Sequence, residues 1–279
     1  MTPPAVLIAQ ISDLHIKRPG QMAYGVVDTA QALERCVVHL NRMQPRPHLV
    51  VISGDLVDGG APEEYAHLLR LLAPLELPYC AIPGNHDRRE NFRSALAGQD
   101  YASPHGAANL KAAIGGLDVV LLDSSVPGAP HGELDPLTLA WLEATLAVAS
   151  ARPALVFLHH PPYVTGIAHM DRQNLRNAPA LAAIVRRHPR VRMIAAGHVH
   201  RAIVTLVAGV PATICPPINH AVDLDLTDAR VPALRLEPPA FHLHVWLAGA
   251  GFGEVVTHLL PVGDFPGPYP FFAADGSLM

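Results

Sequence analysis

The sequence predicts an α/β protein in which helices cover a sheet, and two patterns support this class. Up to Ile203, short apolar runs alternate with longer stretches that have the spacing of an amphipathic helix. Polar clusters follow the apolar runs, as expected where buried strands end in loops. Half of the 279 residues are hydrophobic and only 16% are charged, which is enough apolar material for a sizeable core.

The individual elements follow from these patterns. Six apolar runs are predicted to form buried strands: Val6–Ile11, Leu49–Ile52, Tyr79–Ile82, Val119–Leu122, Ala154–Leu158 and Val191–Ala195. Four stretches between them are predicted to form amphipathic helices: Val27–Met43, Glu63–Leu72, Pro136–Ala149 and Ala178–Arg187. Asp135 precedes the third helix, where an aspartate is a favoured N-cap. The alternation indicates an α/β domain.

The pattern changes after Ile203. Four further runs, separated by Gly and Pro, are expected to be antiparallel strands that complete a second sheet or a layered sandwich: Ile203–Val207, Pro211–Cys215, Phe241–Trp246 and Glu254–Leu259. Residues 264–279 are rich in Pro, Gly and aromatic side chains without any period, which is typical of an irregular tail. No internal repeat or linker divides the chain. We therefore expect a single domain over residues 1–263 and a C-terminal tail over residues 264–279.

Charge and composition exclude several classes of function. The formal net charge is -4 and no Lys/Arg run forms the basic stripe that long nucleic acids require. The N-terminal residues show no basic segment followed by a long apolar one, and no stretch reaches the length of a membrane span. The three cysteines lack the short spacing of a thiolate metal site. We expect a cytoplasmic protein that does not associate with membranes.

Five clusters of ligand-type side chains each follow a predicted strand. They contain Asp13 and His15; Asp55; Asn85, His86 and Asp87; His159 and His160; and His198 and His200. In extended backbone, residues two apart point to one face, which would bring the members of the first and last clusters together. A single cluster is more commonly a turn, a cap or an exposed histidine. Five at strand ends predict a shared site, because open α/β sheets bind ligands at the carboxyl ends of their strands.

The chemistry of these side chains indicates two metal ions. Oxygen and nitrogen donors without cysteine suit manganese, iron, zinc, cobalt or nickel. Seven candidate ligands are too many for one ordinary ion and suit two ions that share a bridge. With Asp13 and Asp55 as the only anionic ligands, two dications retain surplus positive charge. A bridging hydroxide and a phosphate anion would then be accommodated, as in two-metal hydrolysis of phosphate esters.

The ordered motifs Asp-x-His, Gly-Asp, Gly-Asn-His-Asp, His-His and Gly-His-x-His, from Asp13 to His200, strongly resemble those of the calcineurin-like metallophosphoesterases. Tyr24-Gly25 and the run His159-His160-Pro161-Pro162 resemble the bacterial class III cyclic nucleotide phosphodiesterases and the related glycerophosphodiesterase. The resemblance implies a four-layer α/β/β/α sandwich of two mixed sheets flanked by helices. It also makes a homo-oligomer an expectation.

The resemblance further implies roles for individual residues. Asp13, His15, Asp55 and His200 would hold the first ion, and Asp55, Asn85, His159 and His198 the second, with Asp55 as the bridge. Asn85 and His86 would contact the substrate, with His86 either donating a hydrogen bond to a phosphate oxygen or acting as a proton donor to the departing alkoxide. His220 resembles a second substrate-side histidine, although a structural role fits it equally well.

Some residues near the motifs have open roles. Asp58 and Asp87 are expected to orient ligand histidines or to stabilise turns. His160 would orient a ligand or exchange roles with His159. Arginines near the motifs are candidates for contacting phosphate, although such arginines are more often solvated surface charges: Arg88, Arg89 and Arg201.

The leading hypothesis is a metal-dependent phosphoric diester hydrolase. It would cleave small phosphodiesters, either 3′,5′-cyclic nucleotides or glycerophosphodiesters, by attack of a metal-bound hydroxide. A phosphomonoesterase acting on a small molecule or a phosphoprotein is the alternative, because the same metal core serves both reactions. A non-catalytic interaction scaffold is a more distant alternative, because such a protein would be recognised by the loss of metal ligands, and the full set is present here. Loops at 17–24, 164–176 and 220–239 are expected to select the organic portion of the substrate.

Overall fold

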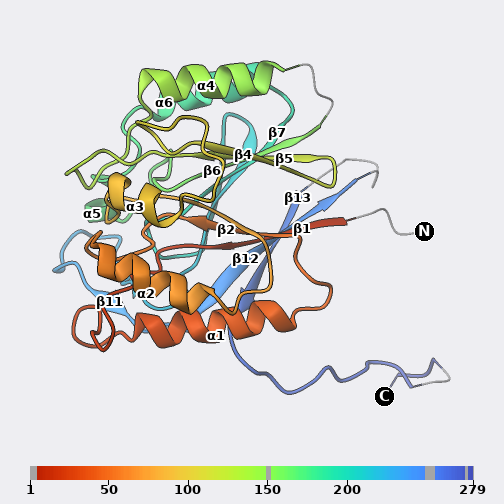
Figure 1. The fold of residues 1–279 in the computed structure, drawn as a ribbon. Coiled ribbons are helices and arrows are strands. Elements are labelled where there is room, and N and C mark those ends of the chain that lie inside the picture. The colour runs from red at the N-terminus through yellow and green to blue at the C-terminus, as the bar shows by residue number, and fades with distance from the viewer. Residues whose placement is uncertain (1–4, 149–151, 249–254, 274–275, 279) are drawn as a thin grey trace.

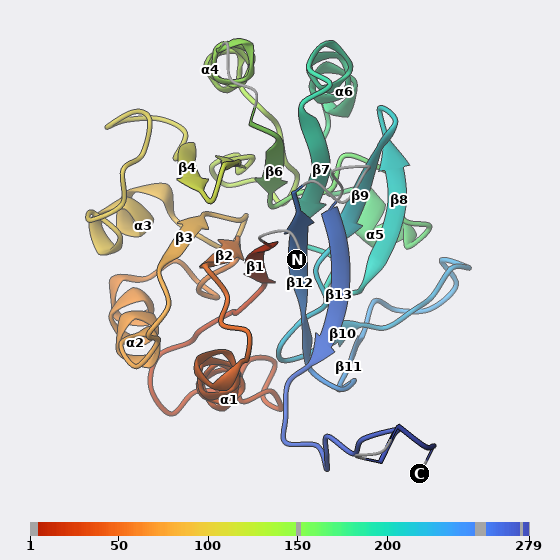
Figure 2. The same ribbon diagram turned by 90° about the vertical axis from the view of Figure 1, so that its right-hand side faces the viewer.

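The four-layer arrangement predicted for the chain is confirmed. The computed structural model describes residues 5–148, 152–248, 255–273 and 276–278. Two sheets pack face to face, and helices cover the outer surface of each (Figure 1; Figure 2). Among the described residues, no helix combines the length and the apolar character needed to cross a membrane. The division into one domain and a tail stays a prediction.

The first sheet has five strands in the order β13-β12-β1-β2-β3. They are β1 (Ala5–Ile11), β2 (Leu49–Ser53), β3 (Tyr79–Ile82), β12 (Ala240–Leu247) and β13 (Val255–Pro261). Strands β1, β2 and β3 are parallel, whereas β12 is antiparallel to both of its neighbours. Three helices, α1 (Thr29–Arg42), α2 (Pro62–Leu72) and α3 (Arg89–Ala95), lie on its outer side (Figure 1).

The second sheet has six strands in the order β4-β5-β6-β7-β9-β8. They are β4 (Leu110–Ile114), β5 (Leu117–Leu122), β6 (Ala154–Leu158), β7 (Val191–Ala196), β8 (Ile203–Val207) and β9 (Val210–Ile214). The helices α4 (Pro136–Ala147) and α6 (Ala178–Arg187) cover it (Figure 2). The expectation that the late strands are all antiparallel is wrong for β9, which pairs parallel with β7 and antiparallel with β8.

Strand β1 shows why the apolar runs are continuous. Leu7, Ala9 and Ile11 face the helices of the first sheet, and Val6 and Ile8 face the second sheet. A strand covered on both faces has no polar side, so its sequence does not alternate. The same reasoning holds for the central strands of the second sheet, which contribute to its helix-side core and to the core between the sheets.

Helix boundaries also follow local chemistry. The Asp28 side chain accepts a hydrogen bond from Gln31 N at 2.9 Å and caps α1. The predicted cap of α4 is confirmed, because Asp135 accepts from Thr138 N at 2.6 Å. The predicted ends at Ala149 and Glu254 lie outside the described residues.

Several short elements were not predicted. Helix α3 buries only Phe92, so it has no apolar period to detect. Helix α5 (Ala168–Asp171) and the hairpin of β10 (Ala221–Val222) and β11 (Leu234–Arg235) are too short to produce one. Strand β4 lies at the edge of its sheet and is only partly buried. Whether such short elements form depends on tertiary contacts.

The buried His242 on β12 predicts an acid-sensitive fold. Burial lowers the pKa of His242 to about 4, and its Nδ1 has no hydrogen-bond partner among the described residues. Because the folded state resists protonation, the stabilisation is complete above the ordinary histidine pKa of about 6.5 and is lost as pH falls towards 4. In urea unfolding, wild type should lose stability between pH 6.5 and 4 more steeply than His242→Gln, by up to about 1.4 kcal/mol per pH unit.

His258→Gln is the matched control on the neighbouring strand, since its side chain is exposed. It should keep the wild-type slope. Parallel slopes for wild type and His242→Gln would contradict the assignment.

Candidate metal centre

The five polar clusters converge at one end of the sandwich. The first three follow β1, β2 and β3 of the first sheet, and the last two follow β6 and β7 of the second. The crevice expected at the carboxyl ends of parallel strands is therefore present, with both sheets contributing to it. Residues far apart in the chain meet there.

The backbone conformation of these clusters differs from the prediction. Positive φ angles between 47° and 72° occur at Asp13, His15, Asp55, His198 and His200. The expectation that alternate residues share a face of extended backbone is wrong, because β1 ends at Ile11 and β7 at Ala196. Left-handed conformations are uncommon for residues other than glycine, and such strain collects at functional sites. Backbone hydrogen bonds hold it, including Asp13 N to Gly54 O at 3.0 Å.

One group of donor atoms comes from Asp13, His15 and His200, whose ligand atoms lie within 4.8 Å of one another. The Nε2 atoms of His15 and His200 are 3.1 Å apart, and Asp13 Oδ1 is 3.4 Å from His200 Nε2. Asp55 Oδ2 lies 3.6 Å from His15 Nε2. All four side chains are buried.

A second group adjoins the first through Asp55. The same Asp55 Oδ2 lies 3.4 Å from His159 Nε2, which is 3.2 Å from Asn85 Oδ1. The His198 ring lies 5.1 Å from the His159 ring, centroid to centroid. His198 Nε2 is buried and has no hydrogen-bond partner among the described residues. The carboxylate of Asp55 thus stands between the two groups.

The opposite ring nitrogens of His159 and His200 are anchored by hydrogen bonds, and that of His15 lies within ion-pair distance of a carboxylate. His159 Nδ1 lies 2.9 Å from Ser53 O, His200 Nδ1 lies 3.0 Å from His220 O, and His15 Nδ1 lies 3.3 Å from Asp58 Oδ1. A carbonyl or carboxylate on one nitrogen fixes the tautomer and leaves the other nitrogen to bind. The expected orienting role of Asp58 agrees with this contact.

Two glycines permit the close approach of the clusters. A Cβ on Gly54, whose φ is +100°, would lie 2.3 Å from His159 Nδ1. A Cβ on Gly84 would lie 2.2 Å from Asp55 Oδ1. Both contacts are shorter than real side chains tolerate, so glycine is required at these positions on steric grounds.

The pKa values of the buried aspartate and histidine side chains are shifted in different directions. Burial opposes ionisation of Asp55, but His159 and other histidines hold its pKa well below the usual range. Burial likewise opposes protonation of His159, yet Asp55 raises the His159 pKa to about 9. Burial lowers the pKa of His198 far below its usual value and that of His200 to about 3. Neutral imidazoles and ionised carboxylates are the forms that bind metal ions, so His198 and His200 are already in the binding form, whereas a metal ion would have to displace a proton from His159.

The residues at this site suit metal ions. Buried carboxylate and imidazole donors and the partly buried Asn85 amide converge on a shared space, and His198 Nε2 lacks any partner among the described residues. An unpaired buried polar atom is costly unless something satisfies it. Oxygen and nitrogen donors of this kind suit divalent transition metals. The histidine and aspartate groups could therefore hold metal ions.

His86 occupies a different place from the buried donors. Its side chain is 35% exposed, its backbone N–H donates to Asp55 Oδ1 at 2.8 Å, and its Nδ1 lies 2.8 Å from Asp58 O. The neighbouring Asp87 faces inward and accepts hydrogen bonds from Leu56 N, Gly84 N and Tyr65 Oη. Asp87 therefore stabilises the loop, as expected for a turn residue.

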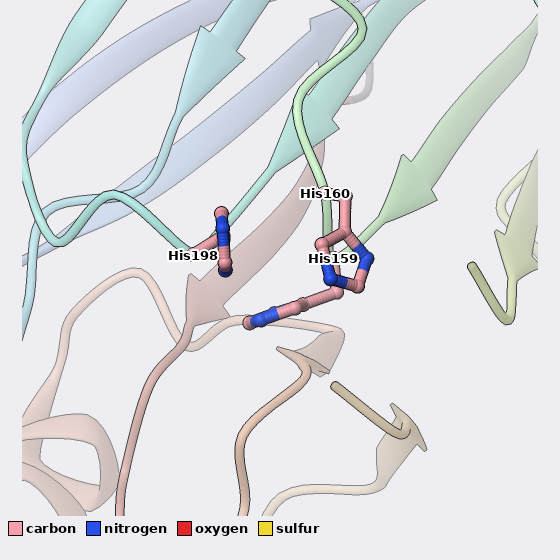
Figure 3. Close-up of side chains that lie close together, drawn as sticks. All are labelled: His159, His160 and His198. Atoms are coloured by element: carbon pink, nitrogen blue, oxygen red, sulfur yellow. The ribbon is translucent and has the colours of Figure 1, made fainter. Parts of the chain in front are cut away.

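The adjacent histidines 159 and 160 leave the end of β6 in different directions, and His159 reaches towards the side on which His198 lies (Figure 3). The Nδ1 atom of His160 is 2.8 Å from Ser124 Oγ, and its ring lies 4.7 Å from that of His198. Only His159 meets the Asp55 carboxylate within ion-pair distance. The contact with Asp55 favours His159 as the donor beside that carboxylate, while a ligand atom of His160 lies within 4.8 Å of those of His159 and His198.

A cavity of about 430 Å³, here called the histidine cavity, opens over these groups. Its lining includes Tyr24, His86, Met170, His220 and residues 232–234. The His220 ring lies 5.3 Å from that of Tyr24, and burial lowers the His220 pKa to about 3. The three loops expected to select the substrate all contribute to this cavity.

A second cavity of about 830 Å³, here called the arginine cavity, was not predicted. Its lining includes Asn85, Arg88, Arg89, Arg93, Ser125 and residues 104–106. Asn85 also lines the histidine cavity, so the two meet beside the donor groups. The segments that complete the arginine cavity resemble ordinary turns in the sequence, and no sequence signal would have identified them.

The three arginines near the motifs have different environments. Arg89 Nε donates to Asp123 Oδ2 at 2.8 Å, and Arg201 Nη1 donates to Glu237 Oε1 at 3.0 Å. No ion pair or hydrogen bond joins the Arg88 guanidinium to another described residue, and Arg88 is exposed. Arg88 is thus the member of this trio whose charge is not paired within the described chain.

A four-layer sandwich with histidine and aspartate donors at the strand ends of both sheets defines the metallophosphoesterase class of fold. The chain belongs to the calcineurin-like phosphoesterase family, whose model matches residues 6–202. It is 36% identical over 275 residues to a probable glycerophosphodiester phosphodiesterase of Arcobacter nitrofigilis, covering 98% of this chain and 100% of the relative. It is 37% identical to a 3′,5′-cyclic adenosine monophosphate phosphodiesterase of Pseudomonas aeruginosa, covering 72% and 71%.

Solved structures support the fold. A dimetal phosphatase from Danio rerio superposes with a TM-score of 0.62 at 16% identity, covering 92% of this chain and 99% of that chain. A purple acid phosphatase from yellow lupin superposes with a TM-score of 0.64 at 12% identity, covering 99% and 53%. At these identities the likeness concerns the fold alone.

Proposed function

We propose that this protein is a phosphodiesterase that uses two divalent metal ions to hydrolyse small phosphodiesters. The observation that carries the proposal is the pair of donor groups that share Asp55 at the meeting point of the two sheets. Family membership and the diesterase names of both relatives support the reaction type. The substrate would be a glycerophosphodiester or a 3′,5′-cyclic nucleotide.

The residues that would hold the ions are those expected from the motifs. Asp13, His15, Asp55 and His200 would hold the first ion, and Asp55, Asn85, His159 and His198 the second. The short distances within each group and the position of Asp55 between the groups support this assignment. The donor set suits manganese, iron, zinc or cobalt.

When bound, two such ions supply a water of lowered pKa and positive charge for the phosphoryl oxygens. The protein's own residues then position and protonate the substrate. Asn85 and the half-exposed His86 face the cavity, where His86 would give a proton to the departing alkoxide. His220 and Tyr24, whose rings are in contact, also line this cavity and would contact the organic group of the substrate.

The charge environment favours a diester over a monoester. A monoester dianion generally needs cationic side chains beside the metal ions. Arg89 and Arg201, two of the arginines near the motifs, are already paired with Asp123 and Glu237, and the unpaired Arg88 lines the arginine cavity rather than the histidine cavity. A diester carries one negative charge and does not need these contacts.

A comparison of two aryl substrates tests the proposal. After chelation and reconstitution with manganese, iron, zinc or cobalt, the protein should hydrolyse bis-(p-nitrophenyl) phosphate faster than p-nitrophenyl phosphate. The metal-free protein should hydrolyse neither. Faster cleavage of the monoester would reassign the protein as a phosphomonoesterase, and inactivity of fully metallated protein towards aryl diesters and cyclic nucleotides would refute hydrolysis of diesters.

A further inference from the structure

We infer that the arginine cavity binds an anionic arm of a linear phosphodiester, so that the preferred substrates are linear diesters with a second negatively charged group. This inference rests on the proposed phosphodiesterase function and deepens it. It starts from the position of the cavity beside the donor groups, where Asn85 lines both cavities.

Two adjoining cavities fit the shape of a linear diester. Its phosphorus carries two separate organic arms that leave in different directions. The two ester oxygens of a cyclic nucleotide belong to one ribose ring, so its organic part lies on a single side. A phosphate placed between the cavities would direct one arm of a linear diester into each.

The linings of the two cavities differ in charge. The histidine cavity is lined by imidazole, aromatic and apolar groups such as Tyr24 and Met170. The arginine cavity contains three guanidinium groups, of which only that of Arg89 is paired with a carboxylate. Positive charge without a local counterion attracts an anion, and the guanidinium fork matches a carboxylate or a phosphate.

The two remaining arginines differ in how they are held. Arg93 donates to the carbonyl oxygens of Gly106 and Ala107 at 3.2 and 2.8 Å, lies over the Tyr101 ring at 5.3 Å, and keeps a buried Nε without a partner among the described residues. These contacts leave its positive charge unneutralised. The stem of Arg88 packs against Gly60, where an added Cβ would lie 2.4 Å from Arg88 Cγ.

The acidic residues of the lining do not cancel this charge. Asp87 is occupied by two backbone N–H groups and the Tyr65 hydroxyl. Glu90 is exposed on α3, where water screens it. Arg88 is consequently the accessible cation of the cavity and the residue that would determine specificity.

The experiment uses two substrates that differ by one carboxylate. Glycerophosphoserine and glycerophosphoethanolamine are compared as substrates of the manganese-reconstituted protein. We expect wild type to prefer glycerophosphoserine by about 10-fold in kcat/KM, and Arg88→Gln to lose most of that preference. Arg88→Lys should retain part of it, and 0.5 M salt should weaken it in wild type because the charge is exposed.

Controls separate recognition from general damage. Arg70→Gln removes an exposed arginine on α2 outside both cavities and should keep the wild-type preference. Metal content and thermal midpoint should be the same in all variants, and Arg88→Gln should lose more activity on glycerophosphoserine than on glycerophosphoethanolamine. A preference that is absent in wild type, or unchanged in Arg88→Gln, overturns the inference.

The outcome also distinguishes this inference from the proposed function. Hydrolysis of cyclic adenosine monophosphate with neither linear diester cleaved would overturn the anionic-arm site and leave the phosphodiesterase intact. Failure to cleave any diester would overturn the proposed function itself and the inference that rests on it.

Discussion

An Asp55→Asn variant should lose about 10³-fold or more of its diester hydrolysis and should retain less metal after dialysis. The substitution keeps the shape of the side chain but removes the negative charge that stands between the two donor groups. One carboxylate oxygen lies 3.6 Å from His15 Nε2 and 3.4 Å from His159 Nε2, while the other accepts the His86 N–H. Few substitutions in the chain would disturb both groups at once.

The measurements are metal content by mass spectrometry, kcat/KM on an aryl diester, and circular dichroism to verify folding. Asp100→Asn is the matched control, since Asp100 is exposed, and it should behave as wild type. Folding of Asp55→Asn should largely survive because the remaining donors and both hydrophobic cores are unchanged. Wild-type metal content together with wild-type activity would exclude the bridging role.

A His86→Ala variant should lose about 10²- to 10⁴-fold in kcat on glycerophosphodiesters with little change in metal content. His86 is positioned by its Nδ1 contact with Asp58 O and by the edge-on packing of its ring against His15, at a centroid distance of 4.6 Å. These contacts direct a half-exposed ring into the histidine cavity. Its proton would assist an alkoxide, which is a poor leaving group.

The dependence on leaving group identifies the role. A p-nitrophenolate leaves without protonation, so bis-(p-nitrophenyl) phosphate should be affected much less than a glycerophosphodiester. His169→Ala, which removes another histidine of the same cavity, should change either rate by no more than a few-fold. Equal losses on both substrates in His86→Ala would instead indicate that His86 stabilises charge or positions the phosphate.

The strands and the donor residues were predictable because both are local properties of the sequence. The run Ala154–Leu158 is apolar throughout and Val6–Ile11 is interrupted only by Gln10, which is typical of strands covered on both faces. Short elements such as α3 were missed because one buried residue, Phe92, gives no period. The parallel pairing of β9 with β7 was missed because pairing partners are chosen by non-local contacts.

The sequence by itself determined which side chains are candidates for the chemistry and that each cluster follows a strand, since motif and strand are adjacent in the chain. Tertiary structure decided how they meet. His159 Nδ1 contacts Ser53 O across 106 residues of chain, and the two belong to different sheets. The left-handed backbone at Asp13 and Asp55, and the arginine cavity beside Asn85, likewise arise from the packing of distant loops, which no local pattern encodes.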